Sequence, residues 1–252
     1  MLAMSVIVPS FNQDRYIRET LQNLEMLKAK APSFGVHLQI ILVDNCSDIP
    51  TQNQIRAFSH VIDNLIMEPD KGQYDAINKG LKLVAGDYWT WLNTDDLIDM
   101  DGFEQLTGLL QQKPDTDYIY GDVAYIDEFS AHHKNSSSGE ISLNQLLLTD
   151  ASISQPGSFF RTAFTRPLGY LEPYQFAFDY EFLLRCLKNN ARVVKIPVTV
   201  AHFRYYDTSK SGSRDFRFLK EQLIINKKYG GSFFSKLGFM LRLRILKRKL
   251  LN

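Results

Sequence analysis

Cysteine is scarce in this chain, and long apolar runs and a leader sequence are missing. The two cysteines, Cys46 and Cys186, are too few for a disulfide framework and lack metal-ligand spacing, so we expect a reducing compartment. No stretch has the uninterrupted apolar length of a membrane-spanning helix. The opening residues, MLAMSVIVPS, contain no basic leader, and their apolar run is too short for a signal peptide. Together these absences predict a cytoplasmic protein.

The composition is typical of a folded chain, but the charges are unevenly distributed. Hydrophobic residues make up 44% and charged residues 23%, which excludes wholesale disorder. The length of 252 residues suits one large domain or one domain with appendages, and the net charge of +1 gives no reason to expect a nucleic-acid partner. No acidic residue follows Glu221, whereas the basic residues after it are Lys227, Lys228, Lys236, Arg242, Arg244, Lys247, Arg248 and Lys249. An acidic body therefore carries a basic tail.

Strands and helices alternate strictly as far as Leu92. Continuous apolar runs predict strands, and apolar residues three or four apart predict helices between them. The predicted strands are Met4–Val8, Leu38–Val43, Asn64–Met67 and Tyr88–Leu92. The predicted helices are one through Ile17, Leu21, Leu24 and Leu27, a short polar one at Thr51–Phe58 and one at Tyr74–Val84. This order predicts an α/β fold with a parallel sheet and right-handed crossovers.

The second half of the chain is less regular. Helices are predicted at Phe103–Leu110, Phe178–Leu187 and Asp215–Lys228. Short strands are predicted at Tyr118–Tyr120, Val123–Ile126, Arg192–Ile196 and Val198–Tyr205. The segment from His132 to Gly139 is predicted to be a polar loop, and its histidines are expected to be solvated because no carboxylate or cysteine lies at ligand spacing.

Polar side chains follow each of the first four predicted strands, at the point where the strand ends. They are Asn12, Asp44, Glu68 with Asp70, and Asp95 with Asp96. The carboxyl ends of parallel strands meet at one edge of a sheet, where ligands bind in open α/β folds. We therefore expect the four clusters to lie together beside a nucleotide crevice.

The stretch GDYWTWLNTDD, from Gly86 to Asp96, ends an apolar strand with two adjacent carboxylates, Asp95 and Asp96. Mg²⁺ and Mn²⁺ prefer oxygen ligands and are typically shared between carboxylates and the phosphates of a substrate. The same pattern also occurs where a strand simply ends in a solvated acidic turn. The other three polar clusters favour the cation site.

Several segments resemble those of family-2 glycosyltransferases. VIVPSFN, ILVDN, EPDKGQYDAINKG and GDYWTWLNTDD resemble the donor-side motifs in their usual order. QPGSFFRTAFTRPLGYLEP resembles the acceptor-side segment, FDYEFLLR the segment with the catalytic base, and FRYYDTSKS the segment that closes over the diphosphate. The resemblance extends from Met4 to Ser211. It implies the A-type, nucleotide-diphospho-sugar-binding fold (GT-A), with a Rossmann-like, mostly parallel central sheet flanked by helices.

The resemblance also implies a domain organisation. Residues 1–212 would form the catalytic domain, with a donor half at about 1–98 and an acceptor half at about 99–212. Residues 213–252 would form a C-terminal helix and a basic amphipathic tail.

A reaction and its residues follow from the same resemblance. It implies inverting transfer of a sugar from a nucleotide-diphosphate donor, with UDP as the default, to a hydroxyl of a saccharide or lipid-linked acceptor in cell-surface polysaccharide synthesis. Asp179 would take the acceptor's proton, and Asp96 would hold a divalent metal, Mn²⁺ or Mg²⁺, that stabilises the leaving diphosphate. His202 is a second candidate ligand, because the histidine of the family's C-terminal segment appears here as Tyr206. The donor-binding residues implied are Pro9, Phe11, Asn12, Asp44, Glu68, Asp70, Asp75, Lys79, Asn93, Asp95, Arg204 and Lys210.

Some of these residues also have simpler interpretations. Asp179 could be an acid at a helix N-terminus, where the helix dipole favours negative charge. Asp75 and Lys79 are four residues apart, the spacing of an ordinary ion pair on a helix. Arg204 and Lys210 suit phosphate contacts, since Arg offers a fork of donors and Lys a point charge, but either could equally lie on the surface.

The basic tail carries its own apolar pattern. Phe239, Leu243, Leu246 and Leu250 recur at helical spacing, and Leu241 and Ile245 fall almost opposite them. Each basic residue near an anionic membrane contributes about 1 kcal/mol to binding. We therefore expect peripheral association with the inner face of the cell membrane. The alternative is that one face of the tail packs on the body or on a second subunit in a homodimer.

Two other classes of protein remain as alternatives. A sugar nucleotidyltransferase or a dinucleotide oxidoreductase could use a similar sheet, but these usually place a glycine-rich loop after the first strand. The corresponding residues here, PSFNQDRY, contain no glycine. A non-catalytic nucleotide-sugar-binding module would tolerate the loss of Asp96 and Asp179, and both are present.

Overall fold

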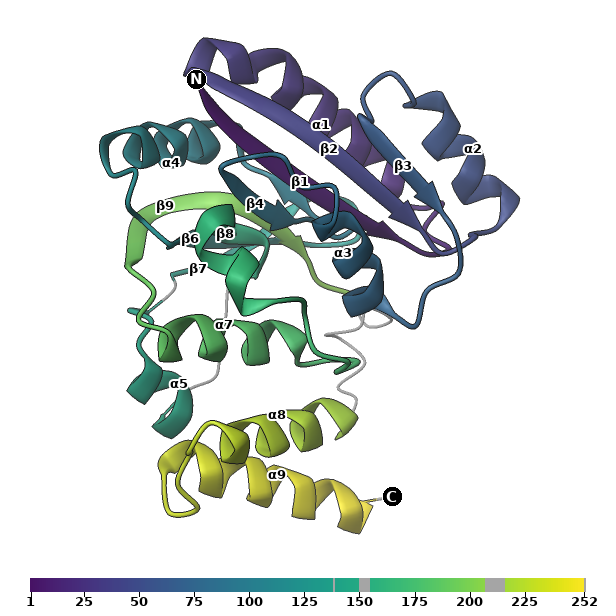
Figure 1. Ribbon diagram of the computed structural model, residues 1–252. Helices are drawn as coiled ribbons and strands as arrows, with labels where there is room; N and C mark the ends of the chain where they lie inside the picture. Colours follow the sequence, from purple (N-terminus) through teal and green to yellow (C-terminus); the bar gives the residue numbers. More distant parts are fainter. Residues whose placement is uncertain (138, 150–154, 207–215, 252) are drawn as a thin grey trace.

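A nine-stranded sheet forms the centre of the computed structural model, with helices on both of its faces (Figure 1). The structure describes residues 1–137, 139–149, 155–206 and 216–251. Strands follow one another across the sheet in the order β3-β2-β1-β4-β8-β6-β9-β5, and β7 pairs with β6 off this path. The fold is therefore a mixed α/β sheet with two helical layers.

The first half alternates strand and helix, as predicted. Its elements are β1 (Leu2–Ser10), α1 (Ile17–Lys30), a short 3₁₀ helix η1 (Ala31–Phe34), β2 (Val36–Asp44), α2 (Ile49–Ala57), β3 (Asn64–Met67), α3 (Gln73–Leu81) and β4 (Tyr88–Trp91). Strand β1 pairs in parallel with β2 and β4, and β2 pairs in parallel with β3. The predicted parallel sheet is confirmed for this half of the chain.

Each face of the sheet has its own core. In β1, the side chains of Met4, Val6 and Val8 pack with α1 and α4 on one face, whereas Ile7 packs with α3 and α7 on the other. Successive side chains of a strand point to opposite faces, so a strand covered on both faces is apolar at every position. This explains the continuous apolar runs in the sequence.

The second half adds antiparallel pairs to the sheet. Its elements are β5 (Leu97–Ile98), α4 (Met100–Gln112), β6 (Tyr118–Ile126), β7 (His132–Ser136), α5 (Leu143–Leu148), η2 (Gln155–Gly157), β8 (Ser158–Arg161), α6 (Thr162–Thr165), η3 (Arg166–Leu168), α7 (Phe178–Lys188) and β9 (Val193–Arg204). Strand β8 is antiparallel to both β4 and β6, and β6 is parallel to β9. Beyond β4 the sheet is mixed rather than mostly parallel.

Three predictions for this half are corrected by the structure. The strands predicted at Tyr118–Tyr120 and Val123–Ile126 are one strand, β6. His132–Ser136 forms strand β7, antiparallel to β6, instead of a polar loop. Its side chains are largely exposed, so no apolar alternation marks it in the sequence. The two strands predicted around Pro197 are one strand, β9, whose register against β6 shifts beside Gly121 and Asp122. A bulge of this kind accommodates a proline, which has no N–H to give to the ladder.

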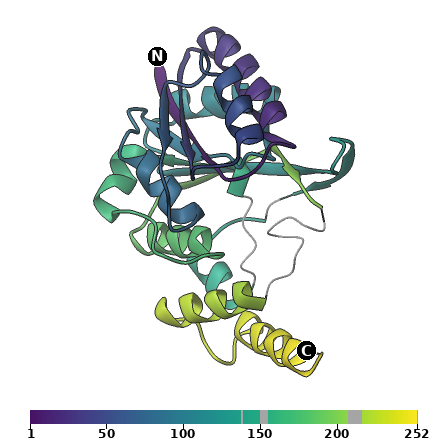
Figure 2. The same ribbon diagram turned by 90° about the vertical axis from the view of Figure 1, so that its right-hand side faces the viewer.

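The last two helices, α8 (Phe216–Lys228) and α9 (Lys236–Leu251), form a hairpin at one end of the molecule (Figures 1 and 2). Leu219 of α8 and Leu237 and Leu241 of α9 form a small core between them. Asn226 of α8 fastens the hairpin to the body by donating to the Leu147 carbonyl and the Tyr180 hydroxyl. No helix among the described residues is long and apolar enough to cross a membrane.

Candidate active site

The acid pair lies where β4 ends, in the middle of the sheet. Strand β4 is fully buried between β1 and β8, and the Leu92 amide still donates to the Ile7 carbonyl of β1. The chain then turns, with the Asp96 amide donating to the Asn93 carbonyl at 3.2 Å. The sheet therefore delivers Asp95 and Asp96 at the edge where its parallel strands end.

The two carboxyls have different surroundings. Asp96 is 0% exposed, and its Oδ1 and Oδ2 accept from the Arg204 amide and the Asn93 side chain, both at 3.0 Å. Asp95 is partly exposed, and its Oδ2 accepts from the Tyr206 hydroxyl at 2.9 Å. Burial raises the pKa of Asp95, while burial and the neighbouring Asp95 charge raise the pKa of Asp96 well above its usual range. The site therefore disfavours two negative charges and suits a ligand that brings positive charge.

Arg204 organises the turn that carries this pair. Arg204 is a predicted contact of the donor phosphates, but the residue is 1% exposed. Its Nε donates to the Asp95 carbonyl at 2.9 Å, and its Nη2 donates to Glu19 at 2.7 Å. Its Nη1 donates to the Asp127 carbonyl and the Ser130 hydroxyl, both at 2.9 Å. In this structure the guanidinium is therefore bound to the protein and holds the acid turn against β9.

Aromatic residues enclose the same corner. The Arg204 guanidinium lies 4.6 Å from the centre of the Tyr16 ring, a cation–π contact. Tyr206, the residue in place of the family's histidine, packs on Tyr16 with ring centres 5.2 Å apart. No sequence pattern points to Tyr16 or Glu19, because their contacts arise only when α1 packs beside β9.

Asn93 links the acid pair to α3. Its side-chain oxygen accepts from Gln73 Nε2 at 2.5 Å, while its nitrogen donates to Asp96. Gln73 is the first residue of α3, so the start of this helix is fastened to the end of β4. Asn93 therefore lies beside the acid pair, and its role in donor binding stays a prediction.

The loops after β1 and β2 are held together by Asp44. It is one of the predicted donor-binding residues, but it is 0% exposed, and its oxygens accept from the hydroxyls of Ser10 and Ser47 and from the Ser47 amide. Asn12, with a φ of 48°, joins the same loops by bonding to Ser47 and Asp48. The two other predicted residues in this loop differ in exposure. Pro9 is buried in β1, whereas Phe11 is 58% exposed.

The remaining donor-side residues surround the start of α3. Lys79 donates to the Pro69 carbonyl at 2.6 Å and forms an ion pair with Glu68 at 3.0 Å. It does not form the ion pair with Asp75 that their spacing of four residues allows. Asp75 accepts from the Lys71 amide, and Asp70 accepts from the Gly72 amide. Burial raises the pKa of Asp70. Lys210 lies outside the described residues.

Asp179 lies in the first turn of α7, next to β4. The preceding residue, Phe178, packs on Trp91 of β4 with ring centres 5.9 Å apart. Asp179 itself is partly exposed and accepts from the Tyr180 amide at 2.7 Å. The helix that carries the predicted base therefore packs directly on the strand that leads to the acid pair.

Glu221 of α8 holds the loop before Asp179, a role that sequence reasoning missed. Its two carboxylate oxygens accept from three consecutive backbone amides, those of Gln175, Phe176 and Ala177, at 2.8–3.0 Å. The only sequence signal is that Glu221 is the last acid of the chain.

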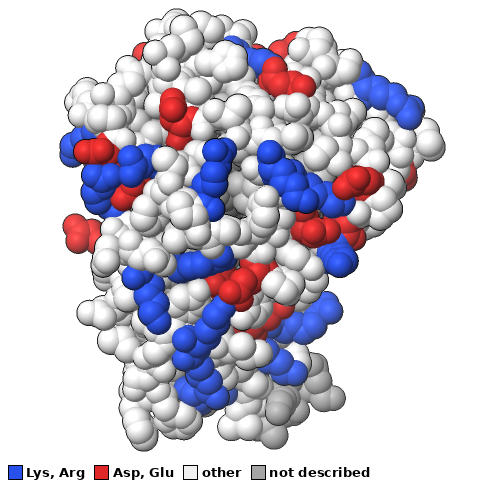
Figure 3. Space-filling model, viewed as in Figure 1, with Lys and Arg blue, Asp and Glu red and all other residues white. Residues whose placement is uncertain are grey.

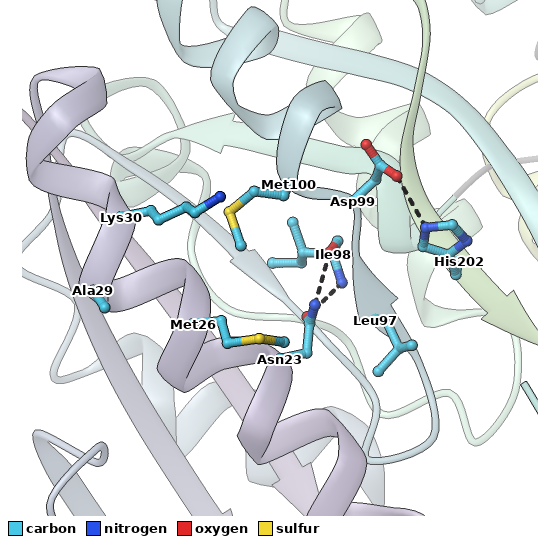
Figure 4. A pocket seen from close by; sticks show the side chains of 9 residues that line it. All are labelled: Asn23, Met26, Ala29, Lys30, Leu97, Ile98, Asp99, Met100 and His202. Atoms are coloured by element: carbon cyan, nitrogen blue, oxygen red, sulfur yellow. Dashed lines mark hydrogen bonds and ion pairs between the residues drawn. The ribbon is translucent and has the colours of Figure 1, made fainter.

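His202 is not bonded to the acid pair. Its Nε2 lies 3.0 Å from Asp99 Oδ2, on the rim of a pocket (Figure 4). This hydrogen bond lowers the pKa of Asp99, which also caps α4 by accepting from the Gly102 amide. Across the described ranges, no group of three or more histidine, cysteine, aspartate and glutamate side chains is arranged to hold a metal.

This sheet order, with an acid pair at the end of β4, defines a GT-A glycosyltransferase fold. S. aureus TarS 1-349, solved with UDP-GlcNAc, is similar with a TM-score of 0.69 and 16% identity, over 99% of this chain and 73% of that chain. The mannosyltransferase PcManGT from Pyrobaculum calidifontis, solved with GDP-Man and Mn²⁺, gives a TM-score of 0.66 at 16% identity, over 96% and 68% of the two chains.

The sequence places the chain in a family. The family model for glycosyl transferase family 2 matches residues 5–169, and the chain belongs to this family. The PGL/p-HBAD biosynthesis glycosyltransferase of Mycobacterium tuberculosis is 26% identical over 222 residues, which cover 86% of this chain and 82% of the relative. An uncharacterized glycosyltransferase of Haemophilus influenzae is 23% identical over 189 residues, 73% of this chain and 62% of the relative. The recognition of a glycosyltransferase from its motifs is confirmed.

Proposed function

We propose that this chain is an inverting, metal-dependent glycosyltransferase that moves a sugar from a nucleotide-diphosphate donor, with UDP as the first candidate, to a saccharide or lipid-linked hydroxyl. The observation that carries the proposal is the pair of adjacent carboxyls, Asp95 and Asp96, whose pKa values are raised where β4 ends. Membership of the family supports sugar transfer. The UDP-GlcNAc and GDP-Man complexes of TarS and PcManGT support a nucleotide-sugar donor.

The acid pair fits a divalent cation. Both carboxyls offer oxygen ligands. The guanidinium of the nearby Arg204 donates to Glu19 and to two carbonyl groups, so it does not neutralise the two carboxylates. Sequence motifs point to Asp96 as the ligand, but Asp96 is 0% exposed. We therefore propose that the partly exposed Asp95 holds the ion directly, while Asp96 holds the turn and adds its charge. When bound, the cation supplies a Lewis acid for the leaving diphosphate. His202, the second predicted ligand, contacts Asp99 instead of the acid pair, and we propose an ion site without it.

Asp179 would serve as the general base. A carboxylate oxygen of Asp179 takes the proton of the acceptor hydroxyl while the acceptor oxygen bonds to the anomeric carbon. The bond from that carbon to the phosphate oxygen breaks, and the nucleoside diphosphate leaves with the electron pair. Attack from the face opposite the leaving group inverts the anomeric centre. The packing of Phe178 on Trp91 supports this assignment, because it holds the first turn of α7 beside β4.

The donor nucleotide would lie along the loops after β1, β2 and β3. Phe11 is exposed there and offers an apolar face to a base, while Asp44 keeps the loops in place through Ser10 and Ser47. Lys79, in the last turn of α3, pairs with Glu68 and brings a positive charge to the loop after β3. We propose the cytoplasm, at the inner face of the cell membrane, as the place of the reaction, because a basic tail suits an acceptor carried on a lipid.

A thermal-shift panel of nucleotide sugars with and without Mn²⁺ tests the proposal. A ligand that binds only the folded chain stabilises it by about 2.7 kcal/mol at 100 times its Kd. We expect one donor to raise the melting temperature in the presence of Mn²⁺, and Asp95→Asn to abolish that shift. Glu104→Gln, an exposed acid on α4, is the matched control and should keep it. The proposal fails if no donor stabilises the chain, or if Asp95→Asn transfers sugar at the wild-type rate.

A further inference from the structure

Helix α9 has two apolar faces, and the body of the protein uses only one. Leu237 and Leu241 are each 1% exposed and pack on α8, with Ile245 beside them. On the other side, Phe239, Leu243 and Leu246 are 63%, 54% and 56% exposed. These three residues, which we call the outer stripe, are spaced by four and three positions and so share one face of the helix. The outer stripe is therefore not needed to pack the hairpin.

Basic side chains lie along one side of the outer stripe. Lys236, Arg244 and Lys247 are exposed on α9, and none of them forms an ion pair within the part of the chain that the structure describes. No acid follows Glu221 in the sequence, so nothing on α9 neutralises them. In Figure 3, the region of α8 and α9 at the lower end shows basic side chains next to broad uncharged areas. An apolar stripe with a basic margin is the pattern of a helix that lies in a membrane interface.

The turn before α9 extends the same surface. Phe234 is 90% exposed, and Phe233 packs against it with ring centres 5.1 Å apart. The Arg242 guanidinium lies 3.9 Å from the centre of the Phe233 ring and donates to the Gly238 carbonyl at 2.7 Å. These contacts hold Phe233 in place and leave Phe234 pointing away from the hairpin core. An exposed aromatic ring beside cations suits the boundary between lipid headgroups and acyl chains.

Charge decides between the two occupants that such a surface could have. A second copy of this chain would bring an identical set of cations against Lys236, Arg244 and Lys247, and like charges repel most where solvent is excluded. An anionic bilayer neutralises the same cations and also takes up the apolar side chains. We propose that the outer stripe and Phe234 dock the protein on an anionic lipid bilayer, with α9 lying in the plane of the interface.

This docking surface gives the proposed function a geometry. The docking inference rests on one part of the proposed function, which is that the acceptor is carried on a lipid. Helix α8 joins the docking surface to the loop of Asp179, because α8 packs on α9 through Leu219 and carries Glu221. When α9 lies on a bilayer, the proposed base would thus be held at a fixed position relative to the bilayer surface.

Vesicle co-sedimentation with the full chain tests this inference. The probes are phosphatidylcholine vesicles and vesicles in which about a third of the lipid is phosphatidylglycerol, a composition at which basic segments bind well. We expect the wild-type chain to sediment with the anionic vesicles only, and less so at high salt, because salt screens the attraction. The variant F239S/L243S/L246S should bind at least ten-fold more weakly, and K236S/R244S/K247S should lose its preference for the anionic vesicles.

The control replaces three exposed apolar residues elsewhere, M26S/I49S/F129S, and should bind like the wild type. Donor-dependent thermal shift and donor hydrolysis in solution are measured on every variant. They should be unchanged, so that a failure of docking is told apart from a failure of the glycosyltransferase proposal. Equal sedimentation of the stripe variant and the wild type overturns the inference. The inference is also overturned if the wild type is a dimer in solution and the stripe variant alone is a monomer, because the outer stripe would then be a contact between two copies.

Discussion

The proposed chemistry depends most directly on the carboxylate group of Asp179. It lies at the start of α7, partly exposed, beside the residue that packs on Trp91. An amide of the same size cannot take a proton from an acceptor hydroxyl, but it leaves the packing of the helix unchanged. General-base catalysis typically contributes 10²–10⁴-fold to a rate.

We therefore expect Asp179→Asn to lower the kcat of sugar transfer by about 10²–10⁴-fold while the KM for the donor changes little. Initial rates at varied donor concentration measure both constants. The Mn²⁺-dependent thermal shift by the donor should survive in this variant, since Asp179 acts on the acceptor. A normal kcat would assign the base to another residue.

Arg204 shows what kind of role a sequence can and cannot reveal. The motif places an arginine near the site, and the structure has it there, but its donors go to Glu19, Asp95 and Ser130 instead of an open cleft. Asp44 is similar, because it faces two serine hydroxyls that become neighbours only when β1 pairs with β2. The position of both residues was predictable from local pattern, whereas their partners depend on contacts between distant segments.

Replacing Arg204 should disturb the acid turn. Lysine keeps the charge but offers no planar fork, so Arg204→Lys leaves several buried acceptors without a donor. We expect a loss of about 1–3 kcal/mol in the free energy of unfolding, together with a higher Mn²⁺ concentration for half-maximal activity. Urea denaturation and a Mn²⁺ titration measure the two effects. Arg18→Lys, on the exposed side of α1, should change neither.

At the scale of elements, the first half of the sheet was predictable, whereas in the second half only the positions of β6 and β9 were. Strands β1 and β2 are covered by helices on both faces, so burial imposes an apolar run that the sequence displays. Strand β7 is held by backbone pairing with β6 and exposes its side chains, so residues 132–136 look like a loop. Strand β9 continues past Pro197 only because β6 accommodates the bulge.

Asp117 joins three strands of the second half. It is 3% exposed at the edge of β6, and it pairs with Arg161 at the end of β8 and with Arg192 just before β9. Burial alone would raise the pKa of Asp117, but the hydrogen bonds and charges of the two arginines outweigh it and lower the pKa. A carboxylate with a lowered pKa stabilises the fold above its unfolded pKa of about 3.9 and loses that contribution as the pH falls through its folded value.

Asp117→Asn should therefore lower the free energy of unfolding by about 2–4 kcal/mol at pH 7. The difference from the wild type should shrink as the pH falls below about 4, where the unfolded chain begins to bind the proton, and should vanish below the lowered folded pKa of Asp117. Urea denaturation at pH 7 and pH 3 measures it. Asp115→Asn is the matched control, because Asp115 reaches the same Arg192 but its side chain is 80% exposed. It should cost less than about 1 kcal/mol at either pH.

On the scale of the whole molecule, the C-terminal hairpin is fastened to α7 and the loop before it by polar contacts as well as by packing. Glu181 of α7, 0% exposed, pairs with Arg185 and accepts from the Tyr229 hydroxyl just after α8. Glu221 bonds the three amides that precede the first turn of α7. The hairpin therefore helps to shape the loop that precedes the proposed base.

Glu221→Gln tests whether this link matters for catalysis. Glutamine has the same shape, but its amide can accept with only one oxygen, so at least one of the three backbone amides loses its partner. We expect the kcat of transfer to fall by about 10-fold, since a misplaced catalytic group is costly, while the Mn²⁺-dependent donor shift and vesicle binding stay the same. Lys220→Gln, the exposed neighbour on α8, should leave all three unchanged. If Glu221→Gln turned over like the wild type, the hairpin would serve docking alone, and the position of Asp179 would be set by the packing of Phe178 on Trp91.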